Sequence, residues 1–310
     1  MNILVINHNV ENCGVYQYGK RVGKILEAST KNNFVYLELD NLKDFEDKVD
    51  EYNPDIIIYN YLSGTMPWMN EKVAQLMRDN GIIQLLLVHN VNYSTFFDYY
   101  LHQDPYYIDD DINFSICRPL FNYIPKLSKS KPDGLKIGSF GFGFRVKYFD
   151  EICRIVNSQL YDINVEIRLH LTHSHFCNNA NDIEAIKNDC ISRISSPNIR
   201  FTFTNDFLTD EEMLDFLYDN DLNIFFYQDY PSYNGISSTI DYALSVKKPI
   251  AICKSRMFSH IIDVTPSICV EDNYLIDIIK NGFAPLEEKY KMWTPDKFID
   301  RIENIIGEIK

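Results

Sequence analysis

Short, continuous apolar runs alternate with amphipathic segments along this chain, and that alternation constrains its fold most strongly. In the first half, the apolar runs lie at residues 2–6, 34–39, 54–59 and 82–88. Between them, apolar residues recur at three- and four-residue steps, as on the buried stripe of a helix. Strands that are buried on both faces and separated by helices indicate a parallel sheet covered by helices on each side.

The same alternation begins again after a polar segment. Residues 127–134, LSKSKPDG, are polar and basic and contain Pro and Gly, which is typical of a linker between domains. A second series of apolar runs and helical patterns follows, at 135–140, 165–171, 199–204 and 222–227. The sequence therefore predicts two α/β domains of the Rossmann type.

Composition limits the partners of this protein. Its 310 residues are 45% hydrophobic and 24% charged, which is typical of a globular protein long enough for two cores. Lys and Arg number 30 against 44 Asp and Glu, so the net charge is −14. We expect no general nucleic-acid surface and no attraction to anionic membranes. Any phosphate site must be a local cationic spot.

Cysteine usage and the N-terminal residues indicate a cytoplasmic location. The seven cysteines form no C-x-x-C pair, which favours free thiols in a reducing compartment. The first residues, MNILVINHNV, are apolar only briefly and lack a basic leader, so they read as a strand rather than a signal peptide. No apolar run approaches the length of a membrane span.

The stretch 227–252, YQDYPSYNGISSTIDYALSVKKPIAI, contains a candidate anion site. A strand-like run at 222–227 leads into a polar turn and then the hydroxyl-rich segment 235–239. A helical pattern follows, and another strand begins at Pro249. Backbone N–H groups and the positive end of a helix attract anions at such a position. An ordinary turn between a strand and a helix has the same local pattern.

This stretch resembles the donor-binding segment of GT-B glycosyltransferases, especially those of family 4. In that family a strand, a Glu-Gly-Phe-Gly-like turn, a Glu-Ala helix and a Gly-x-Pro-Val strand hold the nucleotide sugar. Gly235 matches the glycine of the turn, and Ala243-Leu244 and Pro249-Ile250 match the helix and strand. Asp241 stands where the second glutamate is expected. Tyr233 stands where the first is expected, so the two-carboxylate pattern is incomplete and the stereochemical outcome is open.

Two cations follow the strand predicted at 135–140. Arg145 and Lys147 lie between that strand and a helical pattern, where guanidinium and ammonium groups neutralise a diphosphate well. Family 4 enzymes place an Arg and a Lys after this strand for that purpose, so the resemblance implies that both stabilise the leaving diphosphate. The spacing here is tighter than in the family, and two solvated cations on a loop are the alternative interpretation.

Two histidines and a glycine are the candidates in the first domain. His89 follows the strand at 82–88, at the strand end where open α/β sheets bind ligands. Many family 4 members have a His there, near the transferred sugar. His8, after the first strand, is a candidate general base in an inverting enzyme. Gly14 resembles the first glycine loop of the family. Each of these residues also has a purely structural interpretation.

The donor contacts that the resemblance implies form one set, in which Asp241 binds the ribose hydroxyls. The set consists of Gly14, Tyr233, Asn234, Gly235, Ser237, Ser238 and Asp241.

Two further segments have unusual composition. Residues 93–112 interleave aromatic rings with carboxylates, which suits either sugar recognition or a surface insertion packed down by its own tyrosines. Residues 170–177 include three histidines and a cysteine. On a strand these side chains spread along one face instead of converging, so we expect no metal site.

The resemblance covers nearly the whole chain in element order. It implies the GT-B fold, two Rossmann-like domains facing a central cleft. The acceptor side would be 1–128, the donor side 135–290, and a helix at 291–310 would cross back to the first domain. The implied activity is metal-independent, hexosyltransferase-like transfer from a nucleotide diphosphate sugar to a hydroxyl of a glycan or glycoconjugate, as in polysaccharide biosynthesis. The donor is a substrate, and no cofactor is expected.

Three alternatives remain open at this point. A sugar-nucleotide epimerase with the same architecture would turn over its substrate without an acceptor. A catalytically silent nucleotide-sugar-binding protein is suggested by Tyr233 at the position of a carboxylate. A transferase acting on DNA bases is disfavoured by the negative charge.

Overall fold

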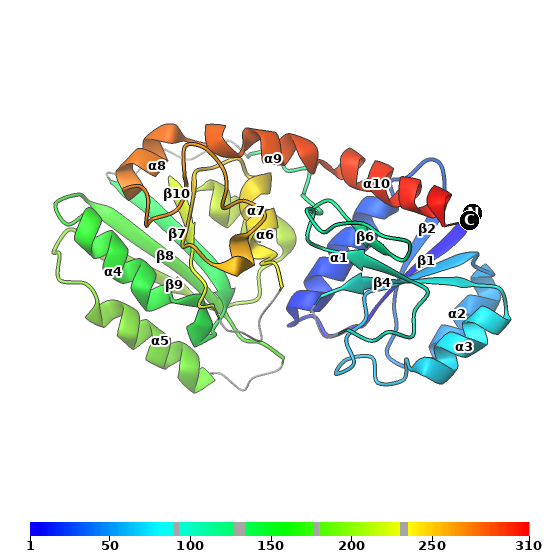
Figure 1. The fold of residues 1–310 in the computed structure, drawn as a ribbon. Coiled ribbons are helices and arrows are strands. Elements are labelled where there is room, and N and C mark those ends of the chain that lie inside the picture. The colour runs from blue at the N-terminus through cyan, green and yellow to red at the C-terminus, as the bar shows by residue number, and fades with distance from the viewer. Residues whose placement is uncertain (90–92, 127–133, 176–179, 230–234, 310) are drawn as a thin grey trace. The chain divides into compact units, whose positions relative to one another are not determined.

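The computed structural model describes residues 1–89, 93–126, 134–175, 180–229 and 235–309. The chain forms two compact units, the first made of Met1–Pro119 with Met292–Lys310 and the second of Leu120–Lys291. Each unit contains one parallel sheet with helices against it, so the predicted α/β class is confirmed (Figure 1). In the described part of the chain, no helix is both long and apolar enough to span a membrane.

The sheet of the first unit has six parallel strands in the order β2-β1-β3-β4-β5-β6. Its strands are β1 (Asn2–Asn7), β2 (Asn33–Glu38), β3 (Ile56–Tyr59), β4 (Ile83–Val88), β5 (Tyr99–His102) and β6 (Asn113–Ser115). Its helices are α1 (Gly14–Leu26), α2 (Leu42–Tyr52), α3 (Glu71–Asp79) and α10 (Pro295–Glu308). Because the strands run parallel, their carboxyl ends all lie at one edge of the sheet.

Alternate residues of the strands in this unit enter two different cores. Ile3 and Val5 pack with apolar residues of α1 and α10, whereas Leu4 and Ile6 pack with those of α2 and α3. The continuous apolar runs in the sequence are therefore explained by burial on both faces. Helix α10, from the end of the chain, is part of this unit and covers the same face as α1.

The sheet of the second unit has five parallel strands in the order β11-β10-β7-β8-β9. Its strands are β7 (Leu135–Phe142), β8 (Val165–Thr172), β9 (Ile199–Thr204), β10 (Leu222–Phe225) and β11 (Ile250–Ile252). Its α-helices are α4 (Phe149–Gln159), α5 (Ala180–Ser192), α6 (Asp210–Tyr218), α7 (Thr239–Ser245), α8 (Leu275–Asn281) and α9 (Glu287–Met292). Three 3-10 helices join them: η1 (Arg145–Lys147), η2 (Arg256–Phe258) and η3 (Ala284–Leu286).

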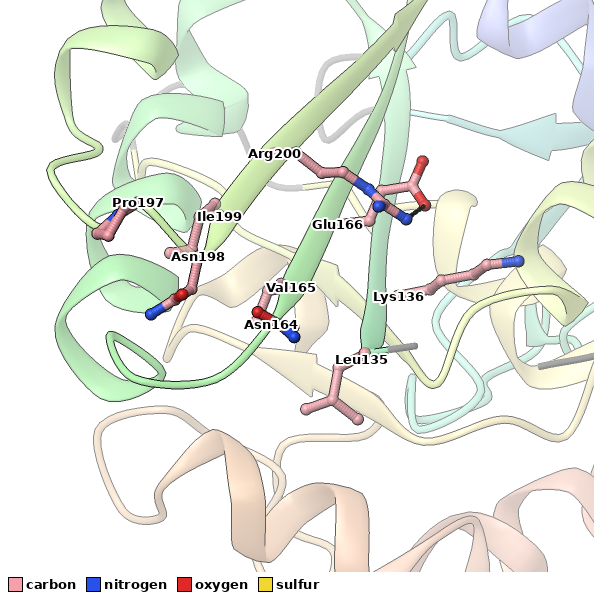
Figure 2. A pocket seen from close by; sticks show the side chains of 10 residues that line it. Leu135, Lys136, Asn164, Val165, Glu166, Pro197, Asn198, Ile199 and Arg200 are labelled. Atoms are coloured by element: carbon pink, nitrogen blue, oxygen red, sulfur yellow. Dashed lines mark hydrogen bonds and ion pairs between the residues drawn. The ribbon is translucent and has the colours of Figure 1, made fainter. Parts of the chain in front are cut away.

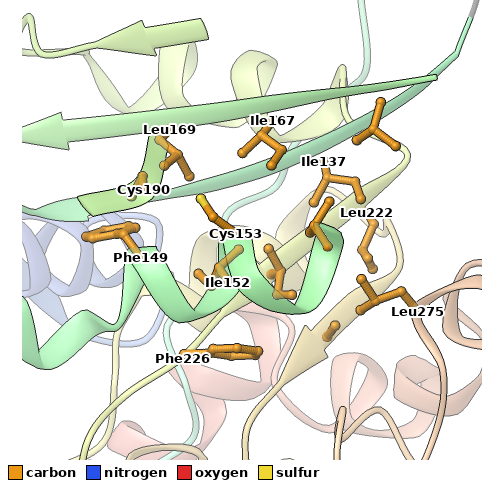
Figure 3. Packing of buried hydrophobic residues seen from close by; sticks show 14 of the residues in the cluster. Ile137, Phe149, Ile152, Cys153, Ile167, Leu169, Cys190, Leu222, Phe226 and Leu275 are labelled. Atoms are coloured by element: carbon orange, nitrogen blue, oxygen red, sulfur yellow. The ribbon is translucent and has the colours of Figure 1, made fainter. Parts of the chain in front are cut away.

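The core of the second unit also has two sides. On one side, Ile167 and Leu169 of β8 pack with residues of α4, α5 and α8 (Figure 3). On the other side, Arg168 and His170 of the same strand contact the ring of Phe216 on α6. Helix α6 begins with the predicted capping box, in which the side chains and backbone of Thr209 and Glu212 bond reciprocally.

The first unit ends at Pro119, earlier than the boundary at residue 128 that the sequence suggests. The segment that follows bonds to helices of the second unit. The Phe121 N–H donates to Ser245 Oγ at 2.9 Å, and the Tyr123 hydroxyl donates to Asp215 Oδ1 at 2.8 Å. Residues 127–133 of the predicted linker lie outside the described residues.

A pair of isoleucine substitutions tests the packing of α10. Ile302 is 1% exposed in the core of the first unit, whereas Ile108 of the same unit is 87% exposed. We expect Ile302→Ala to lower the free energy of unfolding by about 2–5 kcal/mol, because it removes apolar contacts and leaves a cavity. Ile108→Ala should change it by less than about 0.5 kcal/mol. Denaturant unfolding of both variants measures the difference, and equal values would contradict the docking of α10.

Candidate functional site

Two loops meet at the carboxyl edge of the second sheet. The neighbouring strands β7 and β10 end there, and η1 and α7 follow them. A narrow cavity of about 10 Å³ lies between these segments. Its lining includes the predicted residues Lys147 and Ser237, together with Tyr227 and Thr239. The fold therefore brings one predicted cation and one predicted hydroxyl to the same cavity.

Lys147 is held in this place by a glycine and an aromatic ring. A Cβ on Gly141 would lie 2.8 Å from Lys147 Cδ and Cε, so a side chain at position 141 would displace the lysine stem from this place. The Lys147 Nζ lies 5.1 Å from the centroid of the Tyr227 ring, and no described residue forms an ion pair with it. Burial lowers the pKa of Lys147 to about 8. A partly desolvated ammonium that has no carboxylate partner in the described chain is suited to bind an anion.

Arg145, the other predicted cation, is directed elsewhere. Its guanidinium forms an ion pair with Asp189 of α5 at 2.8 Å, and its side chain is 62% exposed. The carboxylate of Asp189 raises the pKa of Arg145. To reach an anion beside Lys147, Arg145 would have to exchange Asp189 for that anion.

The predicted anion site at the start of α7 differs from the expectation in one respect. The Ser237 N–H is not available to a ligand, because it donates to the Met257 carbonyl at 3.0 Å. The Ser237 and Thr239 hydroxyls bond to each other at 2.8 Å. Ser238 is the N-cap residue but makes no side-chain capping bond. At the start of α7, a ligand would therefore meet side-chain hydroxyls and not the N–H of Ser237.

The remaining predicted donor contacts differ in how exposed they are and in the unit to which they belong. Gly235 is half-buried, and Asp241 is fully buried in the first turn of α7. Tyr233 and Asn234 lie outside the described residues. In the first unit, Gly14 is the exposed first residue of α1.

At the carboxyl edge of the first sheet, amides and an imidazole form a hydrogen-bonded row. Asn60 Nδ2 donates to Asn7 Oδ1 at 2.7 Å, and Asn60 Oδ1 lies 2.6 Å from His89 Nε2. Gln103 Nε2 bonds to His89 Nδ1. These four residues follow or end β1, β3, β4 and β5, which are neighbours in the sheet.

The predicted residue His89 is therefore a neutral member of this row. With the Gln103 amide donating to Nδ1, the hydrogen of the ring is on Nε2 and points to Asn60. Burial, and then the charges of His8 and Arg118, lower the pKa of His89 to about 3. A neutral imidazole with both nitrogens bonded is not a general base at neutral pH.

His8, the candidate base, is fully buried. Its Nδ1 accepts from the Val10 N–H at 3.1 Å, and its ring centroid lies 5.8 Å from that of Tyr16. The ring does not reach solvent, so a substrate would have to enter the first unit to reach it.

Comparison with known proteins gives matches to solved structures only. No protein-family model and no curated protein matches the chain. Anabaena Alr3699/HepE, in complex with UDP and glucose, matches with a TM-score of 0.65 at 11% identity over 99% of both chains. A glycosyltransferase from Rickettsia africae ESF-5 matches with a TM-score of 0.64 at 13% identity, over 99% of this chain and 98% of the other. The lipopolysaccharide outer core galactosyltransferase WaaB matches with a TM-score of 0.54 at 10% identity over 99% of both.

The chain has the GT-B fold. The predicted fold class is thereby confirmed, whereas membership of family 4 stays a prediction.

A larger cavity in the second unit lies at the wrong edge of the sheet for a GT-B active site. Its volume is about 320 Å³, and its lining includes the amino ends of β7, β8 and β9 (Figure 2). Glu166 and Arg200 form an ion pair across it at 3.2 Å, and Lys136 is bonded to Asp219. Ligands of open α/β sheets bind at the carboxyl ends, so we do not assign the donor to this cavity.

Two other predictions concern residues 93–112 and the histidine-rich segment. Strands β5 and β6 extend the first sheet, and between them Tyr107 stacks on His102 with centroids 3.7 Å apart. Asp109 forms an ion pair with Arg301 of α10. The segment is thus held by a stacking contact within itself and by an ion pair to α10, and its part in sugar recognition stays a prediction. Among the residues that the structure describes, no group of His, Cys, Asp or Glu could hold a metal. Cys177 is not among those residues.

Sequence reasoning missed the amides of the row. Asn7, Asn60 and Gln103 each stand at or just after the end of a strand. A polar residue at the end of an apolar run was the signal that could have found the two asparagines.

The protonation state of His89 is measurable. We expect its imidazole to stay neutral, with the hydrogen on Nε2, from pH 5 to pH 8, because its pKa is lowered to about 3. NMR titration of the ring nitrogens measures this. Denatured protein is the control, in which histidines titrate near the ordinary value of about 6.5. A native His89 that titrates between pH 6 and 7 would contradict the assignment.

Proposed function

We propose that this protein transfers a sugar from a UDP-sugar to a hydroxyl group of a glycan or glycoconjugate. The observation on which the proposal rests is the ammonium of Lys147 at the carboxyl edge of the second sheet, without a described carboxylate partner. Structures of HepE with UDP, with UDP and glucose, and with UDP-glucose support the choice of a uridine diphosphate donor. We further propose that the reaction resembles that of family 4 enzymes and that the transferred sugar is a hexose.

In the proposed reaction the bond between the anomeric carbon and the diphosphate oxygen breaks. The acceptor oxygen forms the new bond to that carbon and loses its proton. Negative charge grows on the diphosphate as it leaves, and a fixed positive charge lowers the energy of that state. Lys147 provides this charge, so we propose that the reaction needs no metal and no cofactor.

We propose that the other predicted residues contact the donor or line the reacting centre. Arg145 assists Lys147 after leaving Asp189. Asp241 binds the ribose, and the hydroxyls of Ser237 and Ser238 contact the donor. His89 lines the reacting centre as a neutral group.

The proposed donor contacts also include Gly14, Tyr233, Asn234 and Gly235, and His8 remains a proposed base.

The location of the reaction is also a proposal. The six cysteines in the described part of the chain are free, which suits the reducing cytoplasm. Sugar nucleotides would be the donors there and glycans the acceptors, with the first unit as the acceptor side and the second as the donor side.

Binding of a nucleoside diphosphate tests the proposal first. We expect UDP to raise the melting temperature of the protein, because a ligand that binds the folded state stabilises it. ADP, GDP and TDP are run in parallel to identify the base. If none of the four raises the melting temperature, the proposed function is wrong.

Substitution of Lys147 tests its role. We expect Lys147→Met to weaken UDP binding by about 10- to 100-fold, the usual worth of a hydrogen bond to a charged group. Lys136→Met is the matched control, because Lys136 lies near the amino end of the same strand, β7. Calorimetric titration measures both affinities. An unchanged affinity in Lys147→Met would remove the observation on which the proposal rests.

Turnover separates a transferase from its alternatives. UDP release that requires an acceptor indicates transfer, whereas conversion of the UDP-sugar alone indicates an epimerase. Binding without either indicates a silent protein.

The pH dependence of UDP binding follows from the lowered pKa of Lys147. Below about pH 8 the amine is protonated and attracts the diphosphate, and above it the charge is lost. We expect affinity to fall as the pH rises from 7 to 9.5, by up to about tenfold per pH unit above the pKa of the free lysine, and to level off once the higher pKa of the lysine in the complex is passed. Lys147→Met should bind weakly and without this slope. An equal slope in that variant would assign the titration to another group.

A further inference from the structure

The Lys147 ammonium lies over the ring of Tyr227. The Nζ lies 5.1 Å from the ring centroid, within the range of a cation–π contact. The lysine stem also lies against Gly141, where an added Cβ would come within 2.8 Å of Lys147 Cδ and Cε. A tyrosine ring attracts the ammonium without neutralising it, whereas a carboxylate would take its charge away from a ligand.

Tyr227 is itself fixed by a cysteine thiol. The Tyr227 N–H donates to Cys253 Sγ at 3.2 Å, and Cys253 Sγ donates to the Tyr227 carbonyl at 3.5 Å. Burial raises the pKa of Cys253 to about 11, so the group stays a thiol and can both donate and accept. Cys253 follows β11 directly, and Tyr227 follows β10, which pairs with it. The thiol therefore continues the contact between the two strands beyond their last paired residues.

A backbone hydrogen bond connects the same loop to the lysine. The Gln228 N–H donates to the carbonyl of Val146 at 2.7 Å, and Val146 is the residue before Lys147 in η1. The loop after β10 thus contacts the lysine in two ways, through the ring of Tyr227 and through the backbone of its neighbour. A displacement of Tyr227 would be transmitted to Lys147 through both contacts.

We propose that Tyr227, fixed by the thiol of Cys253, is a positioning residue that holds the Lys147 ammonium ready for the donor diphosphate. This inference rests on the proposed function. A free lysine side chain has many rotamers, and ordering one on binding costs free energy. An ammonium already placed over a ring avoids most of that cost, and its charge stays available to the phosphates.

Replacement of the ring tests the inference. We expect Tyr227→Leu to weaken UDP binding on the order of tenfold, whereas Tyr227→Phe, which keeps the ring, should stay within about twofold of the wild type. Tyr218→Leu is the matched control, because the Tyr218 ring also lies under a lysine, with Lys248 Nζ at 4.6 Å from its centroid. That variant should bind UDP as the wild type does.

Two further measurements distinguish positioning from a general structural role. Uridine lacks the diphosphate, so Tyr227→Leu should leave its affinity, measured by ligand-observed NMR, unchanged. The double variant Tyr227→Leu/Lys147→Met should bind UDP no more weakly than Lys147→Met alone, because the ring acts through the lysine. Equal weakening of uridine and UDP, or full additivity of the two substitutions, would overturn the inference.

The cysteine offers an independent test that leaves the ring in place. Cys253→Ala removes both hydrogen bonds to Tyr227 and should weaken UDP binding, with uridine again unaffected. Cys253→Ser can still donate and accept, and should restore part of the loss. If Tyr227→Leu does not fold, the two Cys253 variants test the positioning role of Tyr227 in its place.

The outcomes separate the two levels of the proposal. A wild-type protein that binds no nucleoside diphosphate contradicts the proposed function. A wild-type protein that binds UDP, with Tyr227→Leu and Cys253→Ala binding it equally well, contradicts only the positioning role.

Discussion

An ammonium partly shielded from water, with no described carboxylate to neutralise it, distinguishes the carboxyl edge of the second sheet. The chain has a net charge of −14, so most of its surface repels a diphosphate. Lys147 places a positive charge at one point of the second unit, where its stem lies against Gly141 and its Nζ lies over the ring of Tyr227. Arg145, two residues earlier, is already paired with Asp189 and is the less available cation.

The two sheets present different chemistry at their carboxyl edges. The second unit has a cation and hydroxyls, whereas the described row in the first unit consists of Asn7, Asn60, His89 and Gln103, all without charge. Each member of the row bonds to its neighbour, so their side chains are fixed in orientation. Within the row the imidazole of His89 is neutral, because burial lowers its pKa to about 3.

The fold could be predicted from local patterns, and the site only in part. Runs such as 2–6 and 82–88 are apolar at every position because both faces of each sheet are covered, and that is readable from the sequence alone. The position of Lys147 beyond the end of a strand was predictable, because the residue follows an apolar run. The partner of Arg145 was not, since Asp189 is 44 residues away on a helix whose position depends on the whole unit. The contact between Tyr227 and Cys253 likewise requires knowing that β10 and β11 are neighbours.

Helix α10 has a consequence for the order in which the chain becomes structured during its synthesis. The second unit, Leu120–Lys291, is complete in the nascent polypeptide before the ribosome adds α10. Until then, α1 and the strand face beside it lack the isoleucines and Phe298 that cover them. The unit translated second can therefore mature first, while the unit translated first waits with an uncovered apolar face. Such a face is a natural contact for chaperones on the emerging chain.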